Sequence, residues 1–233
     1  MPPATPATGL EFDSLRGILA KETTSKLALT GWAFLALNAV GTGLVALRYA
    51  LPKVPFPTPL PNYTVRHSWL IAHAVFSSVA LLAGPWQFLT ALRRRSIAAH
   101  RWLGRVYCLA VVAGWVTSLP IAVHAQTGEV AAAGFLALGA VWMSTTAVAY
   151  IKIRGRRVQA HREWMVRSYA MTSAAITLRM YLPVMLVSGV PLATAYPLVA
   201  WMCWIPNLVF AEWLVRRRSA VPNYARQRRM SAS

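Results

Sequence analysis

The chain has 233 residues, of which 57% are hydrophobic and only 13% are charged. Its 24 Lys and Arg residues, against 6 Asp and Glu residues, give a formal net charge of +18. A nucleic-acid-binding protein carries such an excess on a polar surface, whereas here the basic residues lie in short gaps between long apolar runs. Composition therefore excludes a soluble enzyme, a disulfide scaffold and a nucleic-acid partner, and it predicts a protein embedded in the lipid bilayer.

Six apolar stretches are long enough to cross a membrane as helices. A spanning helix needs about 20 residues, because the hydrocarbon layer is roughly 30 Å thick and each residue rises about 1.5 Å. We predict spans at residues 27–51, 68–92, 102–124, 130–151, 164–187 and 195–215. The sequence therefore predicts an all-α membrane protein, with a six-helix transmembrane bundle at 27–215, an N-terminal tail at 1–26 and a basic tail at 216–233.

The distribution of Lys and Arg predicts the orientation of the bundle, since cytoplasmic loops hold the basic excess. One side collects the basic residues of both tails and of 93–105 and 152–167, whereas the other side has only Arg48, Lys53 and Arg66. We therefore predict that both termini are cytoplasmic and that the protein resides in a bacterial inner membrane. The basic tail is expected to be disordered and to lie against anionic lipid headgroups at the cytoplasmic face.

Two segments that enter the membrane from the cytoplasmic side have similar sequences, HRWLGRVY at 100–107 and HREWMVRSY at 161–169. A lone carboxylate, Glu212, ends the last span and needs a partner near hydrocarbon, for which Arg105 and Arg167 are the candidates. One interpretation is an ion pair that only joins helices. The other is a cytoplasmic polar pocket for an anion, a metal or a proton-exchanging headgroup. The residues of that pocket would be His100, His161, Glu163, Arg105, Arg167 and Glu212.

Arg179 lies deep within the fifth predicted span, about 22 Å from Trp164 by helical rise. Burying an arginine there is costly unless it has partners. Arg179 shares one helical face with Ser168 and Thr172, so this face is expected to point into the bundle. His73 on the second span lies at about the same depth, and the pair is suited to an anionic group such as a haem propionate, or to a quinone carbonyl. The alternative is an internal tether, in which Arg179 bonds only helix carbonyls, hydroxyls or water.

Other polar and thiol side chains within the spans favour packing. Cys108 and Cys203 lie inside separate helices and are expected to be free and unreactive. Asn207 is expected to bridge helices and to satisfy a backbone carbonyl freed by Pro206. The sequence has no glycine-rich phosphate loop, no His-Glu-x-x-His, no Cys-x-x-Cys and no pair of acidic residues within a span. This pattern argues against a cation-driven transporter and a two-carboxylate hydrolase.

Several of these segments, taken in order, resemble a family of predicted bacterial and fungal membrane proteins catalogued as domain of unknown function 2306. The matching segments are His73, GPWQF at 84–88, HRWLGRVY at 100–107, AHREWMVRSYA at 160–170, LR at 178–179, WIPNL at 204–208 and Glu212. They span roughly residues 68–215 and leave out the first predicted helix and both tails. The resemblance implies the same membrane topology but no reaction. The residues that it singles out are His73, His100, His161, Arg167, Arg179 and Glu212.

Three functions remain open. The leading hypothesis is a membrane redox protein with b-type haem between its helices, exchanging electrons with a quinone or another redox partner. Haem iron takes axial histidines and propionates take arginine. The iron ligands would be His73 at the outer level, with Arg179 on a propionate, and His161 at the inner level, together with His100. The second is a non-redox enzyme or carrier for a lipid-like or quinone-like molecule, which requires a cavity open to one side. The third is a non-catalytic accessory subunit, which requires neither a haem site nor a cavity.

Overall fold

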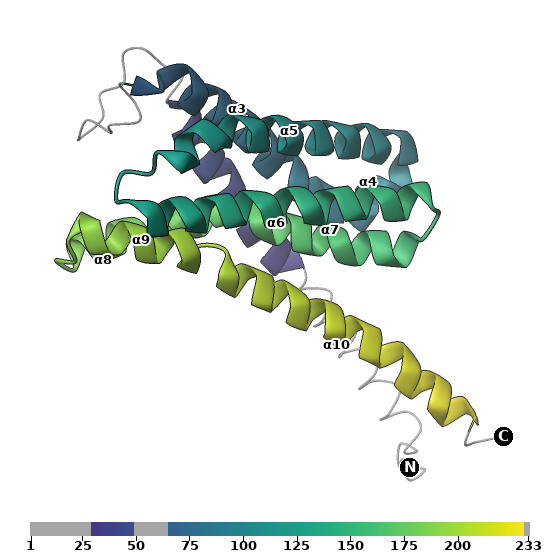
Figure 1. The fold of residues 1–233 in the computed structure, drawn as a ribbon. Helices are drawn as coiled ribbons and strands as arrows, with labels where there is room; N and C mark the ends of the chain where they lie inside the picture. The colour runs from purple at the N-terminus through teal and green to yellow at the C-terminus, as the bar shows by residue number, and fades with distance from the viewer. Residues whose placement is uncertain (1–28, 49–64, 231–233) are drawn as a thin grey trace, which may run out of the picture. The chain divides into compact units, whose positions relative to one another are not determined.

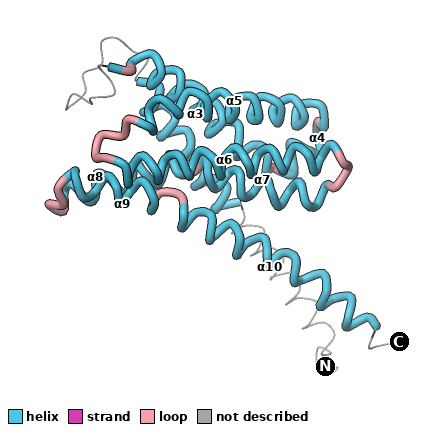
Figure 2. The backbone as a smooth tube through the Cα atoms, viewed as in Figure 1, coloured by secondary structure: helices cyan, strands magenta, loops and turns pink. Residues whose placement is uncertain are grey.

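The structure is a computed structural model that describes residues 29–48 and 65–230. These residues form helices joined by short turns, with no strand among them (Figure 1, Figure 2). Six helical segments within them are long and apolar enough to cross a membrane: Leu29–Leu47, His67–Phe88, Ile97–Val123, Glu129–Arg154, Val158–Val187 and Leu192–Arg217. The predicted all-α, six-helix membrane fold is therefore confirmed. The predicted tail at 1–26 lies outside the described residues.

The chain forms two compact units, residues 1–38 and 39–233, and all the labelled helices belong to the second unit. These helices are α3 (His67–Phe88), α4 (Thr90–Arg95), α5 (Ile97–Val123), α6 (Glu129–Arg154), α7 (Val158–Thr172), α8 (Ala174–Val187), α9 (Leu192–Met202) and α10 (Ile205–Met230). Two of the spans therefore consist of two helices each, α7 followed by α8 and α9 followed by α10.

Two helical hairpins form the centre of the second unit (Figure 1). α3 packs along α5, α6 packs along α7, and contacts between α5 and α6 join the two pairs. α9 packs against α6 and α10 packs against α7, so the last span covers the second hairpin. Large apolar side chains point outward, since Leu109, Val184 and Phe210 are 70%, 64% and 60% exposed. An outer surface of this kind is expected for helices surrounded by lipid.

A network of buried hydroxyl groups links α5, α6 and α7. The Tyr107 hydroxyl lies 2.7 Å from Ser168 Oγ and 2.8 Å from Thr172 Oγ1. Thr146 Oγ1 lies 2.7 Å from Ser168 Oγ, and Trp142 donates its indole N–H to Thr172 Oγ1 at 2.8 Å. Ser168 and Thr172 are 0% and 5% exposed, so this face of the fifth span points into the bundle as predicted. Because these groups bond one another, they join the three helices from within.

Each of the last two spans is interrupted once, between α7 and α8 and between α9 and α10. Asn207 of α10 donates its side-chain amide to the carbonyl of Cys203, at 3.0 Å, and to that of Ala170 on α7, at 3.3 Å. Thr177 of α8 also donates its hydroxyl to the Cys203 carbonyl. The prediction that Asn207 bridges helices is confirmed, but the carbonyls that it bonds are those of Cys203 and Ala170 and not one freed by Pro206. Pro206 lies in the first turn of α10, where a backbone N–H has no intrahelical partner. Both cysteines are free, also as predicted.

Helices extend further than predicted at the basic end of the bundle, where α4 meets α5 and α6 turns into α7. α5 begins at Ile97 rather than at residue 102, because Ser96 caps it by accepting a hydrogen bond from the Ala99 N–H at 3.1 Å. α10 continues as a helix to Met230, so the prediction of a disordered tail is wrong for 216–230. Extending an existing helix adds one hydrogen bond per residue, and Arg, Ala and Gln are strong helix formers.

Candidate functional site

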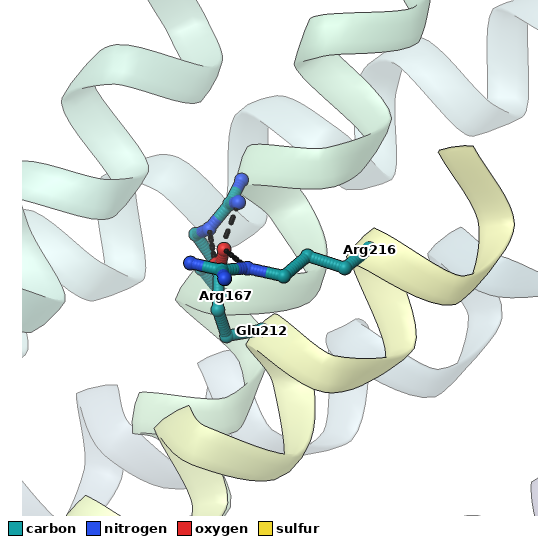
Figure 3. Close-up of polar contacts among 3 residues, drawn as sticks. All are labelled: Arg167, Glu212 and Arg216. Atoms are coloured by element: carbon teal, nitrogen blue, oxygen red, sulfur yellow. Dashed lines mark hydrogen bonds and ion pairs between the residues drawn. The ribbon is translucent and has the colours of Figure 1, made fainter. Parts of the chain in front are cut away.

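Glu212 on α10 joins two arginines near the basic end, as Figure 3 shows. Its Oε2 atom accepts from Arg167 of α7, at 2.9 Å from Nε and 2.7 Å from Nη2. Its Oε1 atom accepts from Nε of Arg216, one turn further along α10, at 2.8 Å. Of the two partners that the sequence offers, Arg167 is therefore the one that Glu212 binds. The cluster has two positive charges and one negative charge, which leaves one positive charge in excess.

Two tryptophans lie against the arginines of this region. The guanidinium carbon of Arg167 lies 4.8 Å from the ring centroid of Trp164, and that of Arg217 lies 4.4 Å from the ring centroid of Trp213. A guanidinium group over an aromatic face is attracted to the ring electrons. Indole rings favour the headgroup zone of a bilayer, which is also the zone in which an arginine is least costly. The Glu212 cluster is therefore expected to lie close to lipid headgroups.

A cavity of about 870 Å³, largely open to the outside of the protein, lies beside the Glu212 cluster, between α6, α7 and α10. Its lining residues are Ala140, Val141, Ser144, Thr145, Trp164, Arg167, Leu208, Val209, Glu212, Trp213 and Arg216. Most of the wall is apolar, and the three charged side chains bond to one another, so the charge is concentrated at one place. The volume falls within the roughly 300–1,000 Å³ of small-molecule sites.

Arg105 and Glu163 belong to the pocket that the sequence predicts, but the structure places them elsewhere. The exposed Arg105 lies over the ring of Trp102, 5.4 Å from its centroid. Glu163 accepts a hydrogen bond at 2.9 Å from Gln159 of its own helix. Neither residue lines the cavity. The two similar segments at 100–107 and 161–169 are therefore not equivalent in the fold, because α10 packs against α7.

His100 of α5 and His161 of α7 are brought together at the basic end, where their imidazoles interact electrostatically. His161 donates its Nδ1–H to the Ala149 carbonyl of α6 at 2.9 Å. Because a carbonyl only accepts, the neutral ring keeps its lone pair on Nε2. His100 Nδ1 is buried and has no hydrogen-bond partner among the described residues. Neither histidine lines the cavity, so the basic end holds two separate polar groups rather than the single predicted pocket.

His73 of α3 is held by a hydrogen bond to the neighbouring helix. It donates its Nδ1–H to the Gly114 carbonyl of α5 at 2.9 Å, and Ser77 Oγ lies 3.4 Å from the same nitrogen. The charge of Arg179 on α8 acts on this imidazole, so the predicted pair lies within electrostatic range. Arg179 also donates from Nη1 to the Ala175 carbonyl of its own helix at 3.0 Å, which is a contact expected of an internal tether.

Sequence reasoning missed Arg216 and the two cavity tryptophans as parts of the site. The sequence assigns Arg216 to the tail, although it follows Glu212 by four residues, the spacing at which helical ion pairs form. Trp164 likewise lies three residues before Arg167, on the neighbouring turn of the same helix. Helical spacing was therefore a usable signal for these contacts. The meeting of α6, α7 and α10 around one cavity depends on tertiary packing and has no local signal.

The described helices define the class of this protein as an α-helical integral membrane protein. The family described as "Predicted membrane protein (DUF2306)" matches residues 70–215, and the chain belongs to this family. The matched region runs from α3 into α10, so it includes both hairpins, all the predicted site residues and the Glu212 end of the cavity. The resemblance found in the sequence is thereby confirmed. No curated protein and no solved structure matches the chain.

Proposed function

We propose that the protein is a membrane-embedded binding protein or carrier for a lipid-like molecule with an anionic headgroup. One observation carries this proposal: a cavity of about 870 Å³ has mostly apolar walls and one excess positive charge beside Glu212. Among the functions that the sequence leaves open, a carrier is the one that requires such a cavity. The site supports binding of the ligand and assigns no chemical step to it.

Each part of an anionic amphiphile has a matching part of the cavity. Its hydrocarbon chain would lie against the apolar wall, where burial is favourable. Its headgroup would meet Arg167 and Arg216, since each guanidinium carries five N–H donors and Glu212 engages only some of them. Phosphate and carboxylate oxygens form strong, charge-assisted hydrogen bonds with such donors. Trp164 and Trp213 would flank the headgroup at the level that indole rings favour.

The charge of the cavity favours an anionic ligand over a quinone. A quinone ring is neutral, so it gains hydrogen bonds from an arginine but nothing from the excess charge. An anion gains both, and the Coulomb contribution is larger in the low-dielectric surroundings of a membrane cavity. Ligand charge is therefore the property that separates the two classes in an experiment.

We expect phosphatidylglycerol to bind more tightly than phosphatidylcholine with identical chains, and Arg167→Gln to remove that preference. Losing one charge-assisted contact is expected to weaken phosphatidylglycerol binding by about ten-fold and to leave phosphatidylcholine binding unchanged. Native mass spectrometry of the detergent-solubilised protein, titrated with each lipid, gives both dissociation constants.

Arg105→Gln is the matched control for this experiment. It makes the same change of charge in a side chain that also lies over a tryptophan but is outside the cavity. We expect its lipid preference to equal that of the unmodified protein. Circular dichroism and size-exclusion chromatography verify that both variants are folded. The proposal is contradicted if the unmodified protein binds the two lipids with equal affinity, or if Arg167→Gln and Arg105→Gln weaken phosphatidylglycerol binding equally. If the two lipids bind with equal affinity and a short-chain quinone displaces them, the results favour a quinone as the ligand instead.

A second candidate function is the binding of b-type haem, favoured by the hydrogen bonds of His73 and His161. Both donate Nδ1–H to a backbone carbonyl at 2.9 Å, as most metal-bound histidines do. In His161 this leaves Nε2 for a metal, whereas Nε2 of His73 lies 3.5 Å from Ser77 Oγ. These two side chains do not suit the same iron. His73 bonds Gly114, whereas His161 meets His100, and the two α5 residues are about 21 Å apart along the helix. A haem would therefore take His161 with His100, or His73 alone.

Absorption spectra test the haem candidate directly. If it is correct, protein purified from cells with ample haem has a Soret band and sharp α and β bands after reduction by dithionite, and His161→Ala or His73→Ala loses them. His124→Ala is the control, because His124 is exposed and, among the described residues, bonds the Pro120 carbonyl one turn earlier, at 3.0 Å. A featureless visible spectrum from folded protein rules against haem.

A further inference from the structure

Ser144 of α6 places a hydroxyl group in the wall of the cavity beside Glu212. The neighbouring Thr145 also lines the cavity, but it is buried and donates its hydroxyl hydrogen to the carbonyls of Val141 and Trp142, at 2.8 Å and 3.0 Å. Ser144 is exposed, and its hydroxyl bonds to none of the residues that the structure describes. The mostly apolar wall therefore carries a hydrogen-bond donor that is available to a ligand.

The depth of Ser144 makes an unpaired hydroxyl unfavourable. Ser144 lies ten residues before Arg154, the last residue of α6, which is about 15 Å along the helix. Hydrocarbon at that depth offers no acceptor for an O–H group. A serine within a helix commonly donates to the carbonyl four residues earlier, as Thr145 does, but Ser144 makes no such bond within the described part of the chain. A ligand with an acceptor oxygen at this level would supply the missing hydrogen bond.

Contacts between helices fix the depth of Ser144 relative to the charges of the cavity. Two hydrogen bonds set the register of α6 and α7, Thr146 with Ser168 at 2.7 Å and Trp142 with Thr172 at 2.8 Å. Ser144 lies midway between the two α6 residues, so it is level with Ala170 of α7, and Arg167 lies about 4.5 Å closer to the basic end. Asn207 of α10 bonds the Ala170 carbonyl at 3.3 Å. Glu212 is five residues further toward the basic end, so Ser144 lies about 7.5 Å deeper than Glu212.

An anionic glycerophospholipid has an acceptor at the required distance from its charge. In a diacyl lipid, the carbonyl carbon of an ester group is about five bonds from the phosphorus atom, which is roughly 6 Å at ordinary bond lengths. A phosphate held by Arg167 and Arg216 would therefore bring an ester carbonyl to the level of Ser144. The acyl chains would then continue along Val141 and Ala140, which line the cavity about one turn deeper on α6.

We propose that Ser144 donates its hydroxyl hydrogen to an ester carbonyl of the ligand, so that the cavity selects an anionic glycerolipid with ester-linked chains. This inference rests on the proposed function and names the chemical class of its ligand. A fatty acid carries its charge and its acceptor oxygens in one carboxylate, so it has no second acceptor at the level of Ser144. An ether-linked lipid has the same charge and the same chains but lacks the carbonyl oxygen. Both are therefore expected to gain nothing from Ser144.

Native mass spectrometry of the full chain with a matched pair of lipids tests this inference. The pair is phosphatidylglycerol with two ester-linked oleoyl chains and its analogue with two ether-linked oleyl chains. We expect the unmodified protein to bind the ester lipid about five-fold more tightly, because one neutral hydrogen bond distinguishes the two lipids. Ser144→Ala is expected to bind both lipids with the affinity that the unmodified protein has for the ether lipid. This variant should fold normally, since Ser144 is exposed and alanine is the strongest helix former.

Thr145→Val is the matched control for Ser144→Ala. It removes a hydroxyl from the same wall, but one whose hydrogen is already engaged by the carbonyls of α6, so the preference for the ester lipid is expected to remain. Arg167→Gln is expected to weaken both lipids equally and to keep their ratio, because it acts on the headgroup that they share. Oleate serves as the control ligand, and we expect Ser144→Ala to leave its binding unchanged. Circular dichroism verifies that each variant is folded.

The inference is overturned if the unmodified protein binds the ester and ether lipids with equal affinity, if Ser144→Ala keeps the preference, or if Thr145→Val also loses it. Each of these results is compatible with tighter binding of phosphatidylglycerol than of phosphatidylcholine, in which case the proposed function stands. If phosphatidylglycerol has no advantage over phosphatidylcholine, the proposed function fails and this inference fails with it. The pair of lipids that binds equally therefore shows which of the two has failed.

Discussion

Replacing Gly84 with alanine is expected to destabilise the folded protein by about 3 kcal/mol, the upper end of the usual cost of overpacking a core. A Cβ atom at Gly84 would lie 1.8 Å from Cε2 and 2.2 Å from Cδ2 of Tyr169. The Tyr169 ring has little freedom to retreat, because it is 4% exposed and its hydroxyl donates to the Leu81 carbonyl at 3.1 Å. Its edge also packs against Phe88, with ring centroids 5.6 Å apart. The clash therefore forces α3 and α7 apart.

Unfolding followed by circular dichroism in mixed detergent micelles measures this effect. Gly41→Ala is the control, because a Cβ at Gly41 meets no atom within 4 Å, and little change in stability is expected. A second comparison repeats Gly84→Ala in a Tyr169→Leu background, where the obstructing ring is gone. The loss of stability is expected to be much smaller there, since the two residues act on each other directly. The same loss in both backgrounds would mean that the ring is not its cause.

The fold was predictable because a bilayer permits few solutions for an apolar chain. Backbone N–H and C=O groups have no water to bond in hydrocarbon, so a run of about 20 apolar residues forms a helix. Hydropathy alone did not give the helix ends, since α5 begins earlier at its Ser96 cap and α10 continues to Met230. At the basic end, helices continue through arginine-rich segments because capping and helix propensity operate where hydropathy has already changed sign.

The candidate site was predictable only as far as charge alone determines it. Glu212 required a cation near hydrocarbon, and the sequence offered Arg105 and Arg167 at similar depths. The choice between them depends on the helix against which α10 packs, and that helix is α7. The separation of the His100 and His161 pair from Glu212 has the same origin. Local sequence specifies which residues reach the basic end, whereas the packing of whole helices decides which of them meet.

Glu212→Gln is expected to tighten the binding of phosphatidylglycerol, whereas Arg167→Gln weakens it. Glutamine keeps the size of the glutamate side chain but removes its negative charge, so the excess at the cavity rises from one positive charge to two. The attraction for an anionic headgroup rises with that charge, and we expect affinity to increase several-fold. The two substitutions remove opposite ends of one ion pair and should therefore change lipid affinity in opposite directions.

A purely structural ion pair leads to a different result. If Glu212 only ties α10 to α7, both substitutions break the same contact at 2.7 Å and both loosen α10. Both would then lower lipid affinity or leave it unchanged. The cost in stability does not separate the two interpretations: the Glu212 side chain is 34% exposed, so losing the pair costs on the order of 1 kcal/mol in either case. The sign of the change in lipid affinity is the quantity that separates them.

The double variant Arg167→Gln/Glu212→Gln completes this comparison. It leaves Arg216 as the charged residue of the cavity and so restores the original excess of one positive charge. If charge governs binding, phosphatidylglycerol affinity in the double variant lies between the two single variants and close to that of the unmodified protein. Added salt should also narrow the differences among the variants, because it screens exposed charges. Native mass spectrometry gives the affinities, and unfolding in parallel verifies that each variant is folded. If the double variant instead binds phosphatidylglycerol as weakly as Arg167→Gln does, restoring the net charge is not enough. Arg167 would then make a specific contact with the headgroup.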